Sequence, residues 1–222
     1  MLPSQTVENY LKTIFLAQTA TPGKELVPMG QLAHALGVVP GTATTMVKAL
    51  SESGLVHYEP YMGVRLTPAG EKLAGLVLRR HRLVELFLVK VVGMSWAEVH
   101  DEAERLEHAV SERLIDLIDE MLGRPAVDPH GDPIPTAEGR IPRAQHENLL
   151  TAPVATPLVV TRVIDQDAEF LRFVERRGLV PGRRIVIESR DSAADAVVLS
   201  VDAGAPASIG TRTAAKILVG LA

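Results

Sequence analysis

The sequence contains no cysteine among its 222 residues. This absence excludes disulfide bonds, cysteine-ligated zinc, iron–sulfur clusters and a thiol nucleophile. Apolar residues make up 46% of the chain and charged residues 23%, which is ordinary for a soluble globular protein. The length suits one large domain or two small ones, and either can bury a real core.

The chain also lacks an excess of basic residues, because 23 Lys and Arg stand against 27 Asp and Glu, a net charge of −4. Nucleic-acid-binding proteins normally carry a basic excess, so the total charge argues mildly against that function. The distribution changes this view. Residues 1–75 hold five basic and five acidic residues, whereas residues 76–122 hold six and ten. The acidic excess therefore lies outside the first third of the chain.

No apolar run is long enough for a membrane helix, which needs about 18 uninterrupted apolar residues. The most apolar stretch, residues 73–94, is interrupted by Arg79, Arg80, His81, Arg82, Glu85 and Lys90. The first residues have neither the basic region nor the apolar core of a secretory signal. We therefore expect a soluble cytoplasmic protein that has no membrane partner.

Residues 5–52 show the pattern of a helix-turn-helix. Apolar residues at helical spacing predict a helix over 5–19, and Pro and Gly residues predict a loop over 21–28. Two short helices then flank Gly37, and the second begins near Pro40. Their shared core is expected from Leu32, Leu36, Met46, Val47 and Leu50.

Residues 55–66 predict a β-wing after these helices, with strands at 55–59 and 64–66 joined by a turn over 60–63. Thr67 and Pro68 then have the residue types of an N-cap and a first helical position. In a winged helix, the second helix of the pair enters the major groove with its N-terminal residues against the bases.

The residues expected to contact DNA are Pro40, Gly41, Thr42, Thr44, Thr45, Lys48 and, in the wing, Arg65. Threonine offers a hydroxyl for base edges or phosphates and a methyl for thymine, and the cationic residues suit phosphates. Without a basic excess the affinity of one domain is expected to be modest, and a dimer with two half-sites would raise it. The alternative is a winged domain that contacts only proteins.

Residues 68–92 predict a long helix, and a second helix is predicted from after Ser95 to about Leu122. Apolar residues of the second helix recur at spacings of three and four, which suits a helix–helix interface, for example between subunits. They are Ala103, Leu106, Val110, Leu114, Leu117 and Met121. Residues 123–153 are rich in Pro and Gly and predict a linker or an irregular extension, not a helix, that contains a domain boundary.

Residues 154–222 predict a small β-barrel. Short apolar runs at 158–160, 184–187, 197–199 and 217–219 have the composition and spacing of strands. A short helix over 167–177 is predicted between the first two of them.

The acidic segment contains residues that are suited to binding a metal ion. His100, Glu104, Glu107 and His108 stand at i, i+4, i+7 and i+8, and His81 and Glu85 form another i, i+4 pair. Gathering such groups costs repulsion and desolvation unless a cation lies among them. Oxygen and nitrogen donors without sulfur suit Mn(II) or Fe(II), although Zn(II), Co(II) and Ni(II) also bind such sites. The alternative is a solvated charged helix face.

A metal-dependent hydrolase with an accessory winged domain is the second functional hypothesis. The sequence has no Gly-rich phosphate loop, no Gly-x-Ser-x-Gly and no His-Glu-x-x-His. A catalytic site would leave the winged domain without a role, whereas a metal-sensing regulator uses both features. We therefore expect that the protein is not an enzyme.

Together these features resemble the diphtheria toxin repressor family of metal-dependent bacterial transcriptional repressors, which includes the manganese transport regulators. The motifs that carry the resemblance are ENYL at 8–11, RHRLVE at 80–85, VHDEAERLEH at 99–108 and PHGDPIP at 129–135. The last third is similar to the SH3-like, FeoA-type domain of that family.

The resemblance implies a mainly α fold with β structure. A winged helix-turn-helix would occupy residues 1–75, a helical metal-binding and dimerisation domain 76–140, a linker 141–153 and the SH3-like FeoA-type β-barrel 154–222. The implied function is a repressor that binds palindromic double-stranded operator DNA of metal-homeostasis genes as a homodimer, when loaded with Mn2+ or Fe2+.

The resemblance also implies roles for individual residues. Glu104, Glu107 and His108 fall on the regulatory metal site, together with Asn9, where relatives have Met or Asp; Glu8 is the substitute for Asn9. Iron-sensing relatives have cysteine at the position of Glu104, and glutamate there is typical of manganese-sensing members. Lys12 stands where some manganese regulators have a second carboxylate, which argues against their close two-metal cluster.

An ancillary site is implied at His81, Glu85 and His100. Asp128 and His130 stand where some manganese relatives bind a second metal through a cysteine and a histidine. Asp165, Gln166 and Asp167 are further candidates in the C-terminal domain.

Overall fold

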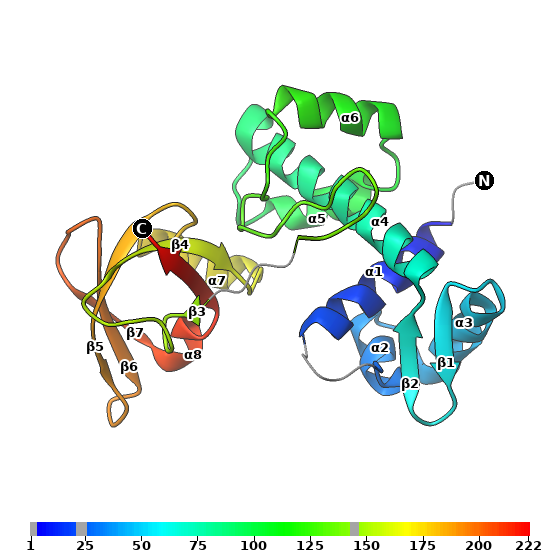
Figure 1. The fold of residues 1–222 in the computed structure, drawn as a ribbon, viewed down its shortest axis with the longest axis horizontal. Coiled ribbons are helices and arrows are strands. Elements are labelled where there is room, and N and C mark those ends of the chain that lie inside the picture. The colour runs from blue at the N-terminus through cyan, green and yellow to red at the C-terminus, as the bar shows by residue number, and fades with distance from the viewer. Residues whose placement is uncertain (1–3, 21–25, 143–146) are drawn as a thin grey trace. The chain divides into compact units, whose positions relative to one another are not determined.

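The computed structural model describes residues 4–20, 26–142 and 147–222, and it divides into two compact units. One unit comprises residues 1–81 and 135–141, and the other residues 82–134 and 142–222 (Figure 1). Residues 21–25 of the predicted loop and 143–146 of the predicted linker lie outside the described residues.

The first unit is a winged helix-turn-helix, as predicted. Helices α1 (Gln5–Ala20), α2 (Met29–Ala35) and α3 (Pro40–Glu52) are followed by the antiparallel hairpin of β1 (Val56–Glu59) and β2 (Gly63–Leu66). Val27 pairs with Val64 and fixes the base of the wing. Of the predicted shared core, Leu32, Val47 and Leu50 are buried, and Leu36 and Met46 pack partly buried against them.

A long helix follows the wing. Helix α4 (Pro68–Phe87) begins where the hydroxyl of Thr67 accepts the N–H of Gly70 at 3.2 Å, which confirms the predicted N-cap. The π-helix η1 (Leu88–Val92) continues α4 to the end of the predicted range. Gly93 then ends the helix in the left-handed conformation, at φ 82°, which favours glycine.

The predicted helix from Ser95 to Leu122 is wrong in one respect, because the chain forms two helices, α5 (Val99–Leu106) and α6 (Glu112–Met121). The backbone of Ser111 is extended, and its hydroxyl accepts the N–H of Leu114 at 3.3 Å. Ser111 therefore starts a new helix, because an N-cap residue leaves helical geometry and satisfies a free N–H of the first turn.

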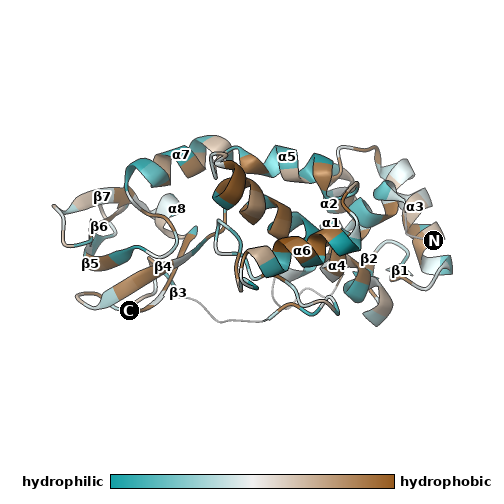
Figure 2. Cartoon of the chain, turned by 90° about the horizontal axis from the view of Figure 1, so that it is seen from above, coloured by the Kyte–Doolittle hydropathy of each residue, from teal (hydrophilic) through white to brown (hydrophobic). Residues whose placement is uncertain are grey.

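This break divides the predicted apolar stripe. Helix α6 buries Ile115 and Ile118, whereas Leu114, Leu117 and Met121 are exposed. Hydrophobic and hydrophilic segments alternate along α6 in Figure 2. The helix therefore has one apolar face in the core and a second apolar face at the surface.

The C-terminal part of the described chain is an antiparallel sheet of six strands in the order β3-β8-β4-β5-β6-β7. Its elements are β3 (Glu147–Asn148), β4 (Pro157–Val163), α7 (Ala168–Arg176), β5 (Arg184–Asp191), β6 (Ala196–Val201), β7 (Ala207–Gly210), α8 (Thr211–Ala214) and β8 (Ile217–Leu221). The four predicted strands and α7 are present, whereas β3, β7 and α8 were not predicted. The mixed fold class is confirmed.

Part of the predicted linker belongs to this C-terminal domain. Strand β3 pairs with β8, and Leu149 and Ala152 are buried in the same apolar core as the strands. Trp96 and Ala97 belong to that core too. Among the described helices, none combines the length and the hydrophobicity that crossing a bilayer requires.

Candidate metal centres and DNA-binding surface

The start of α3 is an open surface, as a DNA-reading helix requires. Pro40, Gly41, Thr42, Thr45 and Lys48 are exposed there, and Ala43 and Val47 on the opposite face are buried. One face of α3 thus packs in the core and the other faces the solvent, which is the amphipathic pattern of a surface helix.

The threonine hydroxyls on α3 are already engaged as donors. Thr44 donates to the carbonyl of Pro40 at 2.9 Å, and Thr45 donates to that of Gly41 at 3.0 Å. Each hydroxyl therefore offers DNA only its lone pairs, together with the adjacent methyl group. Thr44 is half-buried, so its reach is smaller than that of Thr45.

The wing presents more than the predicted Arg65, which is half-buried on β2. At the turn of the hairpin, Tyr61 is fully exposed with a left-handed φ of 66°, and Met62 is 65% exposed. These two residues were not predicted from the sequence. Their exposure could have been predicted, because they occupy the predicted turn over 60–63. Their side chains are not typical of DNA contacts, however, so the sequence did not indicate that role.

Helix α1 carries two of the predicted metal ligands, Glu8 and Asn9, and the structure separates their roles. Both Glu8 and Arg80 are buried, and an Arg80 nitrogen lies 2.6 Å from Glu8 Oε1. The side-chain oxygen of Asn9 is buried and has no hydrogen-bond partner among the described residues. Glu8 therefore helps to bind α1 to α4, whereas Asn9 holds an unused carbonyl oxygen.

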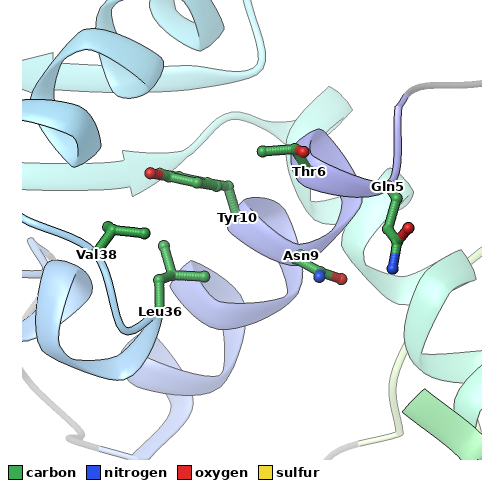
Figure 3. Close-up of a pocket in the computed structure, with 6 residues that line it drawn as sticks. All are labelled: Gln5, Thr6, Asn9, Tyr10, Leu36 and Val38. Atoms are coloured by element: carbon green, nitrogen blue, oxygen red, sulfur yellow. The ribbon is translucent and has the colours of Figure 1, made fainter. Parts of the chain in front are cut away.

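A pocket of about 270 Å3 lies beside Asn9, between α1 and the turn of the helix-turn-helix. Figure 3 shows Tyr10 pointing toward Leu36 and Val38, while the amide of Asn9 points away from them. Asn9 and Tyr10 are consecutive residues of α1, but their side chains therefore point to different sides of the helix. Burial raises the pKa of the Tyr10 hydroxyl, which favours its neutral form as part of the core.

The donors around α5 lie close together, although not on one uninterrupted helix. Glu104 lies on α5, and Glu107 ends it, with its N–H still bonded to the carbonyl of Ala103 at 2.9 Å. His108 follows in the turn, with its Nε2 3.2 Å from Oε1 of Glu107. The expectation of four donors on one helix is therefore corrected to donors on a helix and its C-terminal turn.

Glu107 is fully buried, and His108 is nearly so. A buried carboxylate beside an imidazole is costly unless protonation or a cation compensates it. This donor set is therefore suited to holding a positive ion.

The second predicted group is centred on Glu85. His81 precedes it by one turn on α4, and both side chains are buried. Oε1 of Glu85 lies 3.1 Å from Nδ1 of His100 on α5. The other ring nitrogen of His100 lies 3.8 Å from Glu104 of its own helix.

The third predicted group is a buried loop that follows α6. Oδ1 of Asp128 accepts the N–H groups of His130 at 2.8 Å and Asp132 at 2.9 Å, which fixes the loop. Gly131 has a left-handed φ of 87°, and a Cβ there would overlap the carbonyl of Thr161. Of the two alternatives predicted for this segment, the packed loop fits an irregular extension better than a linker.

This loop brings Asp128 and His130 to Glu85. Ligand atoms of the three side chains lie within 4.8 Å of one another, and all three residues are buried. Oδ2 of Asp128 and Nδ1 of His130 have no hydrogen-bond partner among the described residues. Unpartnered donor atoms that converge in a buried space are what an absent cation would leave, so these residues fit a divalent ion.

The electrostatics of this group favour the same conclusion. Burial and the nearby carboxylates of Asp132 and Glu85 raise the pKa of Asp128 to about 7. Burial lowers the pKa of His130, but Glu85 and Asp128 outweigh it, so the net shift is upward. Nearby carboxylates raise both pKa values, and burial adds to this effect at Asp128 but opposes it at His130.

Two neighbours of this loop were not found from the sequence. Nε2 of His130 lies 2.8 Å from the carbonyl oxygen of Trp96, whose ring stacks on the imidazole at a centroid distance of 5.5 Å. Arg162 forms an ion pair with Asp132. These residues are 30 or more positions from their partners, so no local spacing marks them.

The further candidates of the C-terminal domain are engaged elsewhere. Asp165 forms an ion pair with Lys216 at 2.5 Å, and Asp167 caps the N-terminus of α7. Gln166 donates to Asp132 at 2.7 Å. In the structure these side chains hold the domain together and contact the loop.

Comparison with known proteins identifies three matching family models. Residues 3–64 match the N-terminal DNA-binding domain of iron-dependent repressors, and residues 67–136 match their metal-binding and dimerisation domain. Residues 147–221 match the FeoA domain.

Individual proteins match over most of the chain. The iron-dependent repressor IdeR of Mycobacterium tuberculosis is 30% identical over 207 residues, which cover 87% of this chain and 88% of that protein. The transcriptional regulator MntR of Lysinibacillus sphaericus is 32% identical over 130 residues, covering 57% of this chain and 91% of that protein.

A solved structure, of a manganese-dependent transcriptional repressor in complex with manganese, is 39% identical with a TM-score of 0.88. The match covers 96% of this chain and 99% of that one. These matches support a regulator rather than the hydrolase that was the second hypothesis. The chain therefore belongs to the family of iron-dependent repressors, which are metal-dependent transcriptional repressors.

Proposed function

We propose that this protein is a cytoplasmic repressor that binds palindromic operator DNA of metal-homeostasis genes as a homodimer when loaded with Mn2+ or Fe2+. One observation carries the proposal. The predicted ligands from His81 to His130 all fall within residues 67–136, which match the metal-binding and dimerisation domain, and Asn9 falls within the matched DNA-binding domain. The proposed metal ligands thus come from both the DNA-binding and the metal-binding domain.

The regulatory site of this proposal consists of Glu104, Glu107 and His108, with Asn9 as the ligand from α1. The orphaned, buried oxygen of Asn9 supports this choice, and the ion pair of Glu8 with Arg80 argues against Glu8. When bound, a divalent ion would supply the positive charge that the buried carboxylate of Glu107 requires, and these four side chains would hold it.

Repression requires that the ion binds the conformation of the protein that can bind DNA more tightly than the conformation that cannot. Each tenfold preference shifts that equilibrium by about 1.4 kcal/mol. In a homodimer the conformation that can bind DNA fixes the distance between two recognition helices, which must match half-sites about one helical turn apart.

The exposed apolar face of α6 is the proposed dimer surface. Leu114, Leu117 and Met121 lie on it and are 48%, 51% and 65% exposed. Large apolar side chains that cluster on a helix face indicate a protein interface. The matched family model is itself described as a dimerisation domain.

The ligand set supports Mn2+ or Fe2+ as the cofactor. The proposed ligands are Asp, Glu, His and Asn side chains, so each of them offers an oxygen or a nitrogen, and the sequence has no cysteine. Carboxylate and imidazole donors suit these ions better than soft metals, which prefer sulfur. One relative is named for its dependence on iron and one solved structure for its dependence on manganese.

The test is DNA binding to promoter fragments of metal-transport genes, with Mn2+, Fe2+, Zn2+ or a chelator in parallel. The double variant Glu104→Ala with His108→Ala should lose the metal-stimulated binding and keep its fold. The matched control is Glu175→Ala, which removes an exposed carboxylate of α7, away from the proposed metal and dimer residues, and should behave as the wild type. Unchanged metal dependence in the double variant would refute the assignment of the regulatory site.

A further inference from the structure

The tip of the wing presents two large side chains to the solvent. Between the paired residues Glu59 and Gly63, the chain passes through Pro60, Tyr61 and Met62. Tyr61 is fully exposed, and Met62 is 65% exposed. Neither side chain belongs to the apolar core of the winged domain, so neither helps to hold that core together.

Tyr61 occupies a position of the turn that favours glycine. The N–H of Met62 donates to the carbonyl of Glu59 at 3.1 Å, which closes a β-turn with Pro60 and Tyr61 at its centre. Proline at the second position and a φ of 66° at the third are the pattern of a type II turn. Glycine or asparagine is favoured at that third position, because a Cβ strains the left-handed backbone. Tyrosine at this position therefore costs folding stability.

The glycine of the tip stands two residues later, where packing requires it. Gly63 is buried, and a Cβ there would lie 2.5 Å from the carbonyl oxygen of Val27. Val27 pairs with Val64, so this close approach fixes the base of the wing. The strained backbone at Tyr61 serves no such packing. A strained residue whose side chain is fully exposed indicates a role in binding.

The tip has no basic residue. Residues 58–64 contain one charged residue, Glu59, and it is exposed. A contact of the tip with DNA therefore does not depend on attraction to phosphates. The tyrosine ring and the methionine side chain instead suit apolar contact with sugars and bases. DNA-binding proteins insert apolar side chains, methionine among them, between base steps of the minor groove.

The wing belongs to the same domain as the predicted DNA-reading helix. Strand β1 packs beside α3 in the first unit (Figure 1). The family model of the DNA-binding domain covers residues 3–64, so it includes both α3 and the tip. A major groove of B-DNA is flanked by minor grooves of the same duplex. The tip is thus suited to extend the DNA-binding surface of α3.

We propose that Tyr61 and Met62 form an apolar contact of the wing with the minor groove of DNA, next to the major groove that α3 enters. This inference rests on the proposed function and deepens it, because it adds a DNA contact that is not ionic. Phosphate contacts of residues such as Lys48 weaken with salt, whereas this contact does not. It favours base steps that unstack easily, such as TA and CA, and so adds sequence preference beside each half-site.

The variant Tyr61→Asn separates folding from DNA binding. Asparagine tolerates the left-handed backbone, so the Tm should stay the same or rise. The affinity of the full-length, Mn2+-loaded protein is measured on the promoter fragment that the wild type binds most tightly. It should fall about tenfold, as for the loss of one aromatic contact with a base. Tyr61→Phe keeps the ring and should bind almost as the wild type does.

Salt dependence and footprinting distinguish this contact from a phosphate contact. The plot of log affinity against log salt should shift downward in Tyr61→Asn and keep its slope, whereas loss of a phosphate contact lowers the slope by about one. Hydroxyl radicals cleave DNA at sugars that are accessible from the minor groove. The wild type should protect sugars beside each half-site, and Tyr61→Asn at saturating concentration should lose these protections alone.

The matched control is Ala203→Asn, which changes another exposed residue with a left-handed backbone, at φ 59°, in the C-terminal domain. It should leave DNA binding unchanged. Full DNA affinity in Tyr61→Asn, a lower salt slope, or a Tm that falls together with the affinity would overturn the inference. A wild type that binds the fragment equally well in chelator would refute only the metal dependence of the proposed function, because the effect of Tyr61 is then measured in chelator.

Discussion

The charge of Asp128 is expected to destabilise the metal-free protein. Burial, followed by the carboxylates of Asp132 and Glu85, raises its pKa from 3.8 to about 7. The folded-state pKa lies above the unfolded value, so protonated Asp128 favours the folded state over ionised Asp128. Its contribution to the free energy of unfolding is complete below about pH 4 and is lost as the pH rises through about 7. A shift of about three units corresponds to at most about 4 kcal/mol at pH 8.

The variant Asp128→Asn isolates this charge. Its remaining oxygen can still accept the N–H groups of His130 and Asp132, so the loop keeps both hydrogen bonds. With excess chelator, the variant should be more stable than the wild type by up to about 4 kcal/mol at pH 8, and by less than about 2 kcal/mol at pH 5. Urea denaturation at both pH values measures the difference.

Addition of Mn2+ should reverse this order. The wild type gains stability from the bound ion, about 2.7 kcal/mol at a concentration of 100 times Kd, and the variant, which lacks one charged ligand, gains less. Glu175→Gln on the exposed face of α7 is the matched control and should leave every curve unchanged. A metal-free Asp128→Asn that is less stable than the wild type at pH 8 would refute the reasoning.

Three further results are expected. Lys48→Ala should weaken DNA binding for all sequences and lower the slope of log affinity against log salt by about one per protomer, and an unchanged slope would show that Lys48 meets no phosphate. Thr67→Ala should destabilise the protein by about 1 kcal/mol in thermal unfolding, because α4 loses the cap on Gly70. Leu117→Glu should yield monomers in analytical ultracentrifugation, whereas Leu117→Met should keep the dimer.

The winged helix was predictable because its determinants are local. Periodic apolar residues, Gly37, the hairpin turn and the cap at Thr67 act over a few positions, and the structure shows the elements that they specify. The break between α5 and α6 was not predicted, because the local apolar pattern gives no sign of it. The apolar spacing continues across Ser111, so periodicity alone cannot show that its hydroxyl starts a new helix.

The C-terminal domain illustrates the limit for short strands. Strand β3 has two residues and exists only through its pairing with β8, which is about 70 positions away. No local propensity specifies such a strand, because its hydrogen bonds come from the partner. The same holds for Leu149 and Ala152, which lie in a Pro-rich segment and are buried only by the sheet.

The sequence by itself determined which donors the predicted sites have: carboxylates, imidazoles and an amide, without a cysteine thiolate. It also placed His81, Glu85, His100 and Glu104 at helical spacings that local geometry makes meaningful. Only the tertiary structure decided how they are grouped. It brought the loop of Asp128 and His130 to Glu85 and buried the site, because the packing of distant segments, unlike spacing along a helix, depends on the whole chain.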